Sequence, residues 1–321
     1  MIEPDRIADA RALLARHFGP TPIARATSLS SPGHEVFLKI ETGLPTGSFK
    51  VRGAIYALSM KLAPDTTRLA EGAKAEVVCA STGNHGAAVA FAAQLLGVRA
   101  TIFLPADPNP VKAARILALG ARLVKGGPDL SAAIDAAQDY AARTAAFFLH
   151  DAWDPDVPVG TATIGAEIVE QVLDVDAIYV PMGDTALVRG VASAAKQRRG
   201  SIRIVGVVAA NADAYLSSWK SGDVVETETC DTIADGLAVR RPLARNVASI
   251  RELVDDVVAV SEQEMIAAIR HLHEREQVIA EPAGAAATAA LLKQPTADRT
   301  IVALVTGGNI APELRAQCGI A

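Results

Sequence analysis

The sequence predicts an α/β protein made of two three-layer α/β/α domains with mostly parallel sheets. Strand-like apolar runs alternate with helix-like runs over most of the chain, which is typical of parallel sheets covered by helices on both faces. Half of the residues are apolar while aromatic residues make up only 4%, a composition that suits buried strands. The length of 321 residues suggests roughly two domains.

The predicted strands are short apolar runs bounded by Gly, Pro or polar residues. They cover 35–40, 76–80, 100–104, 121–124, 147–149, 177–180, 202–208, 256–260 and 300–305. The predicted helices lie between them, and glycines close two of these helices at Gly97 and Gly120. They cover 50–62, 86–96, 110–119, 130–143, 163–172, 185–197 and 262–276. We expect a small domain over 69–149 and a large one formed by 1–68 with 150–321.

Composition excludes several kinds of function. The net charge is −5 and charges of both signs are scattered, so we expect no nucleic-acid partner. The apolar runs have strand length, so we expect no membrane span. The first five residues lack the pattern of a secretion signal. The three cysteines, Cys79, Cys230 and Cys318, are too widely spaced for a disulfide framework or a metal motif. A cytoplasmic location is the simplest setting.

Lys50 is the most informative residue of the chain. It follows an aromatic residue in the segment Gly47-Ser-Phe-Lys50-Val-Arg-Gly53 and opens a predicted helix. An amine becomes a nucleophile or a base only when it is neutral. Partial burial, nearby positive groups and a helix N-terminus would each favour the neutral form. The alternative is a solvated lysine at the start of a surface helix.

Three polar, glycine-containing segments each follow a predicted strand. They are Ser81-Thr82-Gly83-Asn84-His85, Met182-Gly183-Asp184-Thr185 and Thr306-Gly307-Gly308-Asn309. Because ligands of open α/β sheets bind beyond the carboxyl ends of the strands, we expect these segments to build one site.

The first two of these segments also open predicted helices. Unpaired N–H groups at a helix start bind a carboxylate or a phosphate, or they are capped by side chains. We expect Ser81 to His85 to combine capping with carboxylate binding, with His85 as a structural hydrogen-bond partner and not a base. At the second segment, Asp184 is a good helix cap but would repel a phosphate. Arg189, one helical turn after Thr185, either offsets this charge or is solvated, and we favour solvation.

Together these motifs resemble the fold-type II pyridoxal-phosphate enzymes, whose fold is that of the tryptophan synthase β chain. The closer resemblance is to the serine/threonine dehydratase (ammonia-lyase) branch, which includes serine racemase. The motifs occur in the family's order over nearly the whole chain. The Lys50 and Asn84 segments are specific in combination. Glu281-Pro-Ala-Gly-Ala285 and the Thr306 segment carry less information.

The resemblance implies a role for each matching residue. Lys50 would hold pyridoxal 5′-phosphate covalently as an imine and then move the substrate's α-proton, while Phe49 packs on the pyridine ring. Asn84 would contact the ring's O3′, and Thr306 would meet the ring nitrogen. The substrate carboxylate would be bound by Ser81, Thr82, Gly83, Asn84 and His85. The phosphate would be held by Gly183, Asp184, Thr185, Ala186 and Leu187.

The chain departs from the family at three places. Most relatives have four glycines in the phosphate loop, where this chain has Gly183-Asp-Thr-Ala186. Serine racemase and similar enzymes have two metal-binding carboxylates where this chain has Val208 and Ala214, so we expect no metal there. Thr82 stands where serine racemase has the serine that reprotonates the opposite face of the α-carbon. Threonine keeps that hydroxyl on a stiffer side chain, which disfavours racemisation. We expect Lys50 and Thr82 to be the catalytic residues.

The expected activity is α,β-elimination from a serine- or threonine-like β-hydroxy amino acid, giving a 2-oxo acid and ammonia. A Thr hydroxyl at the ring nitrogen cannot form a salt bridge, which favours elimination over transamination. The alternatives within this class are a specialised dehydratase, of the hydroxyectoine-utilisation or 3-hydroxyaspartate type, then an amino-acid racemase and a threonine-synthase-like enzyme. The alternative from another class is a non-catalytic α/β module that binds a small ligand. The resemblance also suggests a homodimer.

Overall fold

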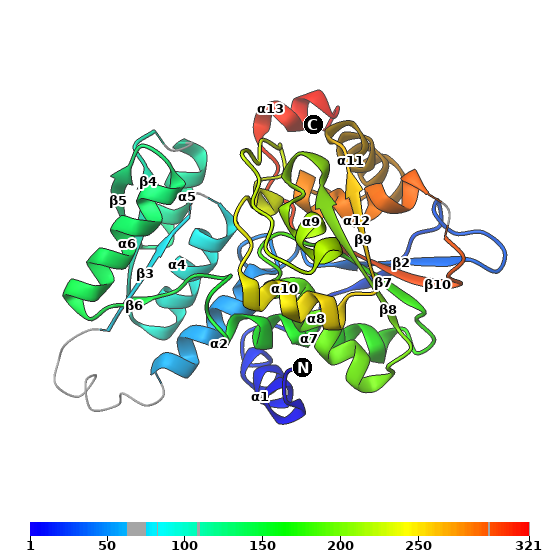
Figure 1. Ribbon diagram of the computed structural model, residues 1–321, viewed down its shortest axis with the longest axis horizontal. Helices are drawn as coiled ribbons and strands as arrows, with labels where there is room; N and C mark the ends of the chain where they lie inside the picture. Colours follow the sequence, from blue (N-terminus) through cyan, green and yellow to red (C-terminus); the bar gives the residue numbers. More distant parts are fainter. Residues whose placement is uncertain (63–74, 82, 108–109, 295, 321) are drawn as a thin grey trace. The chain divides into compact units, whose positions relative to one another are not determined.

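A computed structural model describes residues 1–62, 75–81, 83–107, 110–294 and 296–320 (Figure 1). By the contacts between its residues the chain forms two compact units, one of Met1–Phe49 with Thr161–Ala321 and one of Lys50–Gly160. Helix α2 (Lys50–Leu62) belongs to the second unit because it packs on α4 (Asn84–Leu96). The sequence predicts a small domain over 69–149 and a large domain with a different binding role. These limits and roles remain a prediction.

The first unit contains a six-stranded sheet. Its strands are β1 (Ile23–Arg25), β2 (Glu35–Ile40), β7 (Ala177–Pro181), β8 (Arg203–Ala209), β9 (Asp256–Val260) and β10 (Thr300–Val305). Their order in the sheet is β1-β2-β10-β7-β8-β9. Only β1 is antiparallel to its neighbour. The mostly parallel sheet that the sequence predicts is thereby confirmed.

Helices cover both faces of this sheet (Figure 1). The larger helices of the unit are α7 (Val157–Gln171), α8 (Ala186–Arg198), α10 (Ala244–Leu253), α11 (Glu262–Glu276) and α12 (Pro282–Lys293). Alternate residues of β10 point to opposite faces, as the two-residue period of a strand requires. Ile301 and Ala303 join the core under α11 and α12, whereas Val302 and Leu304 join the core under α7, α8 and α10.

Shorter elements complete the first unit. They are α1 (Pro4–Leu14), α9 (Ala214–Ser221), α13 (Pro312–Gln317) and two single turns, η1 (Ala210–Ala212) and η2 (Asp235–Leu237). Helix α1 packs on α8, and α9 packs on α10 and β9. None of these short elements was predicted from the sequence, and neither were α10 and α12.

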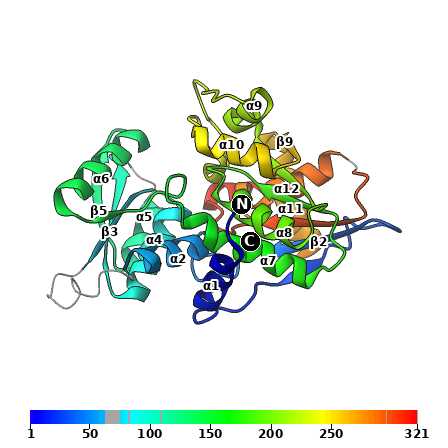
Figure 2. The ribbon, with the colours of Figure 1, turned by 60° about the horizontal axis from the view of Figure 1, so that its bottom comes forward.

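The second unit contains a four-stranded sheet. Its elements are β3 (Glu76–Ala80), β4 (Arg99–Pro105), β5 (Arg122–Gly127), β6 (Phe147–Phe148), α5 (Pro110–Ala118) and α6 (Leu130–Thr144), together with α2 and α4. The sheet is fully parallel, in the order β5-β4-β3-β6. Helix α6 covers one face through Ala133, Ala137 and Ala141, and α4 lies on the other face (Figure 2). The small side chains of α6 let it lie close to the strands.

Local chemistry explains several helix ends. Ser261 and Glu264 form a reciprocal capping box at the start of α11. Gly97, with φ 69°, ends α4 in the left-handed conformation that glycine adopts without strain. Helix α7 begins at Val157 and not at residue 163, and Gly160 lies inside it. A Cβ at Gly160 would stand 2.4 Å from the carbonyl oxygen of Arg52, so this glycine permits a close approach to α2.

Within the described residues, no helix combines the length and apolarity needed to cross a bilayer.

Candidate active site

The predicted site segments follow the carboxyl ends of strands in both units. In the first unit, the segment that leads to Lys50 follows β2, Met182 follows β7, and Thr306 follows β10. In the second unit, Ser81 follows β3. This placement is where parallel α/β sheets bind their ligands.

In the first unit, backbone hydrogen bonds join the segment before Lys50 to the Thr306 segment. Phe49 N donates to Thr306 O at 3.0 Å, and Gly308 N donates to Gly47 O at 3.0 Å. The side chain of Asn309 donates to Thr46 O at 2.9 Å. The backbone amide of Phe49, one residue before Lys50, is therefore held by the Thr306 segment, and Phe49 itself packs on the apolar core under α8.

The late motif around Glu281 joins the same cluster. Glu281 N donates to Gly307 O at 3.0 Å. A Cβ at Gly284 would stand 2.3 Å from Gly307 O, and a Cβ at Gly307 would stand 2.2 Å from Glu281 Oε1. Gly284 is needed because its Cβ would meet backbone, whereas the contact at Gly307 is with the movable end of the Glu281 side chain. Two motifs that carried little information as sequence are thus joined by their backbones.

The predicted phosphate loop lies at the start of α8. Thr185 is the residue before the helix, has a left-handed backbone (φ 67°) and is 1% exposed. A Cβ at Gly183 would stand 2.1 Å from Gly236 O, so only glycine fits there. Gly236 in turn lies against Ala283 at the start of α12, which links this loop to the Glu281 motif. Ala186 and Leu187 form the buried first turn of α8.

Arg189 is not solvated, and this expectation is wrong. The residue is half-buried, and its Nε donates to Thr185 Oγ1 at 3.0 Å. The charges of Asp184 and Arg189 both act on the buried hydroxyl of Tyr215. Burial is the main cause that raises the pKa of Tyr215, Asp184 raises it further, and Arg189 opposes it. Opposite charges therefore lie together at the start of α8.

In the second unit, Lys50 is the first residue of α2 and is partly buried, as predicted from its position. Its Nζ donates a short hydrogen bond to the carboxylate of Asp151, with side-chain exposures of 19% and 11%. The expectation of a neutral amine among positive groups did not include this carboxylate. Asp151 was missed, although it follows β6 just as the other site segments follow their strands.

Two histidines complete the surroundings of Asp151. His85 Nδ1 lies 3.9 Å and His150 Nδ1 lies 3.7 Å from its carboxylate oxygens. Burial lowers the pKa of His85, with Asp151 opposing this effect, and lowers the pKa of His150 to about 4. His85 Nε2 is bonded to Leu149 O at 3.1 Å, which agrees with a structural role for this imidazole.

The carboxylate of Asp151 is ionised in these surroundings. Burial by itself would raise the pKa of Asp151, but Lys50 and then the two histidines outweigh it, and the pKa lies well below its usual range.

The remaining residues of the predicted carboxylate loop lie at the start of α4. Asn84 is the first helical residue, and Gly83 precedes it as the N-cap. Ser81 Oγ accepts a hydrogen bond from Gly83 N at 3.2 Å. Thr82 lies outside the described residues. Through His85 and Asp151, this loop is brought to Lys50 within the second unit.

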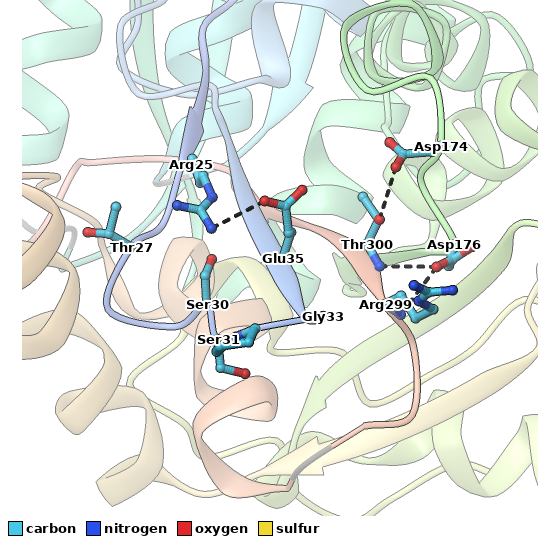
Figure 3. Close-up of a pocket in the computed structure, with 11 residues that line it drawn as sticks. Arg25, Thr27, Ser30, Ser31, Gly33, Glu35, Asp174, Asp176, Arg299 and Thr300 are labelled. Atoms are coloured by element: carbon cyan, nitrogen blue, oxygen red, sulfur yellow. Dashed lines mark hydrogen bonds and ion pairs between the residues drawn. The ribbon is translucent and has the colours of Figure 1, made fainter.

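A separate pocket of about 760 Å³ lies at the opposite end of the larger sheet (Figure 3). Its lining includes Glu35, Asp176 and Thr300, which stand at the amino ends of β2, β7 and β10. Arg25 pairs with Glu35 at 3.2 Å, and the carboxylate of Asp176 accepts from the backbone N–H of Thr300 at 3.0 Å. None of the predicted site residues lines this pocket, and we assign no ligand to it.

At the positions of the absent metal carboxylates, Val208 and Ala214 are buried hydrocarbon side chains. Among the described residues, no group of three or more His, Cys, Asp or Glu side chains is arranged to hold a metal ion.

The comparisons with known proteins agree with this arrangement. The family described as pyridoxal-phosphate-dependent enzyme matches residues 14–307. L-threonine ammonia-lyase of Thermotoga maritima is 36% identical over 312 residues, covering 97% of this chain and 76% of that protein. The structure of maize serine racemase matches with a TM-score of 0.89 and 31% identity, covering 98% of this chain and 95% of that one. A structure of threonine deaminase from T.th. matches with a TM-score of 0.88 and 30% identity, covering 97% and 99%.

The two mostly parallel sheets, with helices on their faces and glycine-containing loops after their strands, define a fold-type II α/β enzyme. The chain belongs to the family of pyridoxal-phosphate-dependent enzymes.

The residues present fit this cofactor. Gly183 admits no side chain, and Thr185 holds the turn that leads into α8, as a loop that surrounds a phosphate requires. The hydroxyls of Thr46 and Ser48, just before Lys50, are buried and have no hydrogen-bond partner among the described residues. Buried hydroxyls of this kind are normally satisfied, so they indicate a polar ligand or water at this segment.

Proposed function

We propose that the chain is a pyridoxal-phosphate-dependent ammonia-lyase that converts a serine- or threonine-like β-hydroxy amino acid into a 2-oxo acid and ammonia. The observation that carries the proposal is Lys50 itself. It is a partly buried amine at a helix start, joined through Phe49 to the Thr306 motif and, through Asp151 and His85, to the predicted carboxylate loop. The relatives named as threonine ammonia-lyase and threonine deaminase support the reaction class.

When bound, the cofactor supplies an electron sink for the charge that develops at the substrate's α-carbon. Lys50 would hold the cofactor covalently through Nζ, and its amine, when neutral, would take the substrate's α-proton. Phe49 would pack against the ring, Asn84 would contact its O3′, and Thr306 would donate to its nitrogen. Thr82 would offer its hydroxyl to the face of the α-carbon opposite Lys50. These roles are part of the proposal.

The N-termini of two helices, α4 and α8, bind the substrate carboxylate and the cofactor phosphate. Ser81, Thr82, Gly83, Asn84 and His85 bind the substrate carboxylate at the start of α4, where unpaired N–H groups attract an anion. The phosphate is bound at the start of α8, by the segment from Gly183 to Leu187. In this proposal the small domain, 69–149, carries substrate binding and the large domain carries cofactor binding.

The first experiment tests for the covalent link. Protein produced with the cofactor should absorb near roughly 410–420 nm, the range expected of a protonated imine of this cofactor. Lys50→Ala should lose this band and the release of 2-oxo acid, while Lys61→Ala, at the other end of α2, should keep the band. A colourless wild-type protein would favour a non-catalytic binding module and defeat the proposal.

The second experiment identifies the substrate. The release of 2-oxo acid would be measured from L-serine, L-threonine, 3-hydroxyaspartate and amino acids derived from hydroxyectoine. Chiral analysis of the recovered amino acid tests for racemisation. The altered loop Gly183-Asp-Thr-Ala186 is the observation that keeps a specialised dehydratase as the second candidate. If the protein only inverts the α-carbon and releases no 2-oxo acid, the proposed activity is wrong and the protein is a racemase.

We further propose that the protein acts in the cytoplasm as a homodimer, on the basis of its resemblance to the serine/threonine dehydratases. Light scattering on the purified, cofactor-loaded protein tests the dimer. A mass near 33.3 kDa, that of one chain, would contradict it.

A further inference from the structure

The contact between Lys50 and Asp151 indicates a role for a residue that the predicted site did not include. Lys50 Nζ donates to Asp151 Oδ2, and the two side chains are 19% and 11% exposed. Lys50 opens α2, whereas Asp151 lies between β6 and α7. The carboxylate is thus brought from a distant part of the sequence to the one amine that the proposed chemistry uses.

Within the described residues, the titratable groups that act on Asp151 come from four places. Lys50 faces it from α2, Cys79 from β3, His85 from α4, and His150 from its own segment. His150 Nδ1 accepts a hydrogen bond from Ala152 N at 3.1 Å, which requires this nitrogen to be unprotonated. Because burial keeps both imidazoles neutral near pH 7, the positive charge next to Asp151 is that of Lys50.

A buried ion pair is costly to break on one side only, because the remaining charge is then buried without compensation. Lys50 cannot remain a simple structural partner, since its nitrogen is needed for the covalent link and then for proton transfer. The ion pair between Lys50 and Asp151 is present in the linked state and after proton transfer only if the Lys50 nitrogen carries a proton. A carboxylate at hydrogen-bond distance favours that charged form.

We propose that Asp151 is a positioning residue that keeps the Lys50 nitrogen protonated in two states, when it is linked to the cofactor and after it has taken the α-proton. In the second state the α C–H bond breaks, its electron pair stays on the carbon, and the proton forms a new N–H bond on Lys50. Asp151 then neutralises the resulting ammonium. This inference rests on the proposed function, because it requires Lys50 to hold the cofactor.

The test is a pH titration of the imine absorbance in the loaded protein. Asp151→Asn keeps the shape and one oxygen acceptor but removes the charge. We expect the midpoint of its titration to fall by about one pH unit or more. Asp151→Glu keeps the charge and should restore most of the shift. The matched control is Asp154→Asn, which removes a buried carboxylate three residues further on, whose ion pair is with Lys61 at 3.8 Å. This control should leave the midpoint unchanged.

The outcomes separate this inference from the proposed function. A wild-type protein without a Lys50-dependent band contradicts the proposed function. A band that is present in all variants, with the same midpoint in Asp151→Asn and in wild type, overturns the role of Asp151 alone.

If Asp151→Asn does not fold, nitrogen-15 NMR of lysine-labelled, cofactor-free wild-type protein decides the question. Lys50 should keep its proton at least to the pH at which a free lysine loses it, about 10.4. Deprotonation at a lower pH would overturn the inference.

Discussion

Arg189 donates from Nε to Thr185 Oγ1 at 3.0 Å, so that its guanidinium lies at the amino end of α8. A cation at this end opposes the helix dipole unless anions lie nearby. Asp184 is one such anion, and the cofactor phosphate would be the second. The departure from the four-glycine loop therefore places an acidic residue, Asp184, near the guanidinium of Arg189.

From this relationship we predict that Arg189→Ala weakens the binding of pyridoxal 5′-phosphate about tenfold, which is the size of one lost charged hydrogen bond. The binding of pyridoxal, which lacks the phosphate, should not change. Equilibrium titration of cofactor-free protein with the two compounds measures both. The matched control is Arg198→Ala, which removes the same charge from the last turn of α8. An equal loss of affinity for both compounds would assign Arg189 to folding alone.

A second prediction concerns acid sensitivity. Burial lowers the pKa of His150 to about 4, from 6.5 in the unfolded chain. Between these pH values the unfolded chain binds more protons than the folded chain. The contribution of His150 to the free energy of unfolding is therefore fully present above about pH 6.5 and is lost as the pH falls toward 4. At about pH 4.5 the loss from this group is roughly 2–3 kcal/mol. His85, whose pKa burial also lowers, adds a loss in the same direction.

Urea unfolding at a series of pH values measures this loss. His150→Gln removes the titrating group and should flatten the curve, although it also removes the stacking on Trp153 at 4.3 Å. His17→Gln, at an exposed histidine, is the control. Identical slopes for His150→Gln and wild type would show that His150 does not titrate in this range.

A third prediction concerns the phosphate loop. Gly183→Ala places a methyl group 2.1 Å from Gly236 O, a clash with backbone that cannot move aside cheaply. Overpacking of this kind costs about 1–3 kcal/mol of unfolding free energy. Gly200→Ala is the matched control, because its Cβ would meet no atom closer than 4.0 Å. Equal urea midpoints for the two variants would show that the loop adapts to the added methyl group.

A fourth prediction concerns metals. Val208 and Ala214, which occupy the positions of the family's metal carboxylates, have no oxygen in their side chains. We expect treatment with EDTA, followed by assay with and without added Mg²⁺ or Ca²⁺, to leave the rate of 2-oxo acid release unchanged. Loss of activity on chelation and recovery with one cation would reveal a site made by other ligands.

The sequence predicted where the site segments lie better than what their side chains contact. The segments after β2, β3, β7 and β10 could be found because strands, turns and helix starts follow from local patterns. Asp151 was not predicted because its role depends on a contact with Lys50, about a hundred residues earlier in the chain. A local sequence pattern does not show such a contact. The rule that found the other segments, a polar residue after a strand, would also have found it.

Other differences also come from tertiary contacts. The sequence predicts a helix that starts at 163, yet α7 starts at Val157 and contains Gly160, where the backbone at Arg52 leaves no room for a side chain. Arg189 reads as a surface residue, and only the folded chain shows its contact with Thr185. Helix α12 has no polar face in its alanine-rich sequence, so no helical period marks it, and the structure buries its first nine residues.

The burial of two of the three thiols has a practical consequence. Cys79 and Cys318 are buried, and burial raises the pKa of both, so they are poor nucleophiles, whereas Cys230 is half-exposed. A maleimide dye should therefore react at one position of the natural chain, without any engineered substitution. Cys230 offers a ready anchor for fluorescence measurements on the unaltered protein.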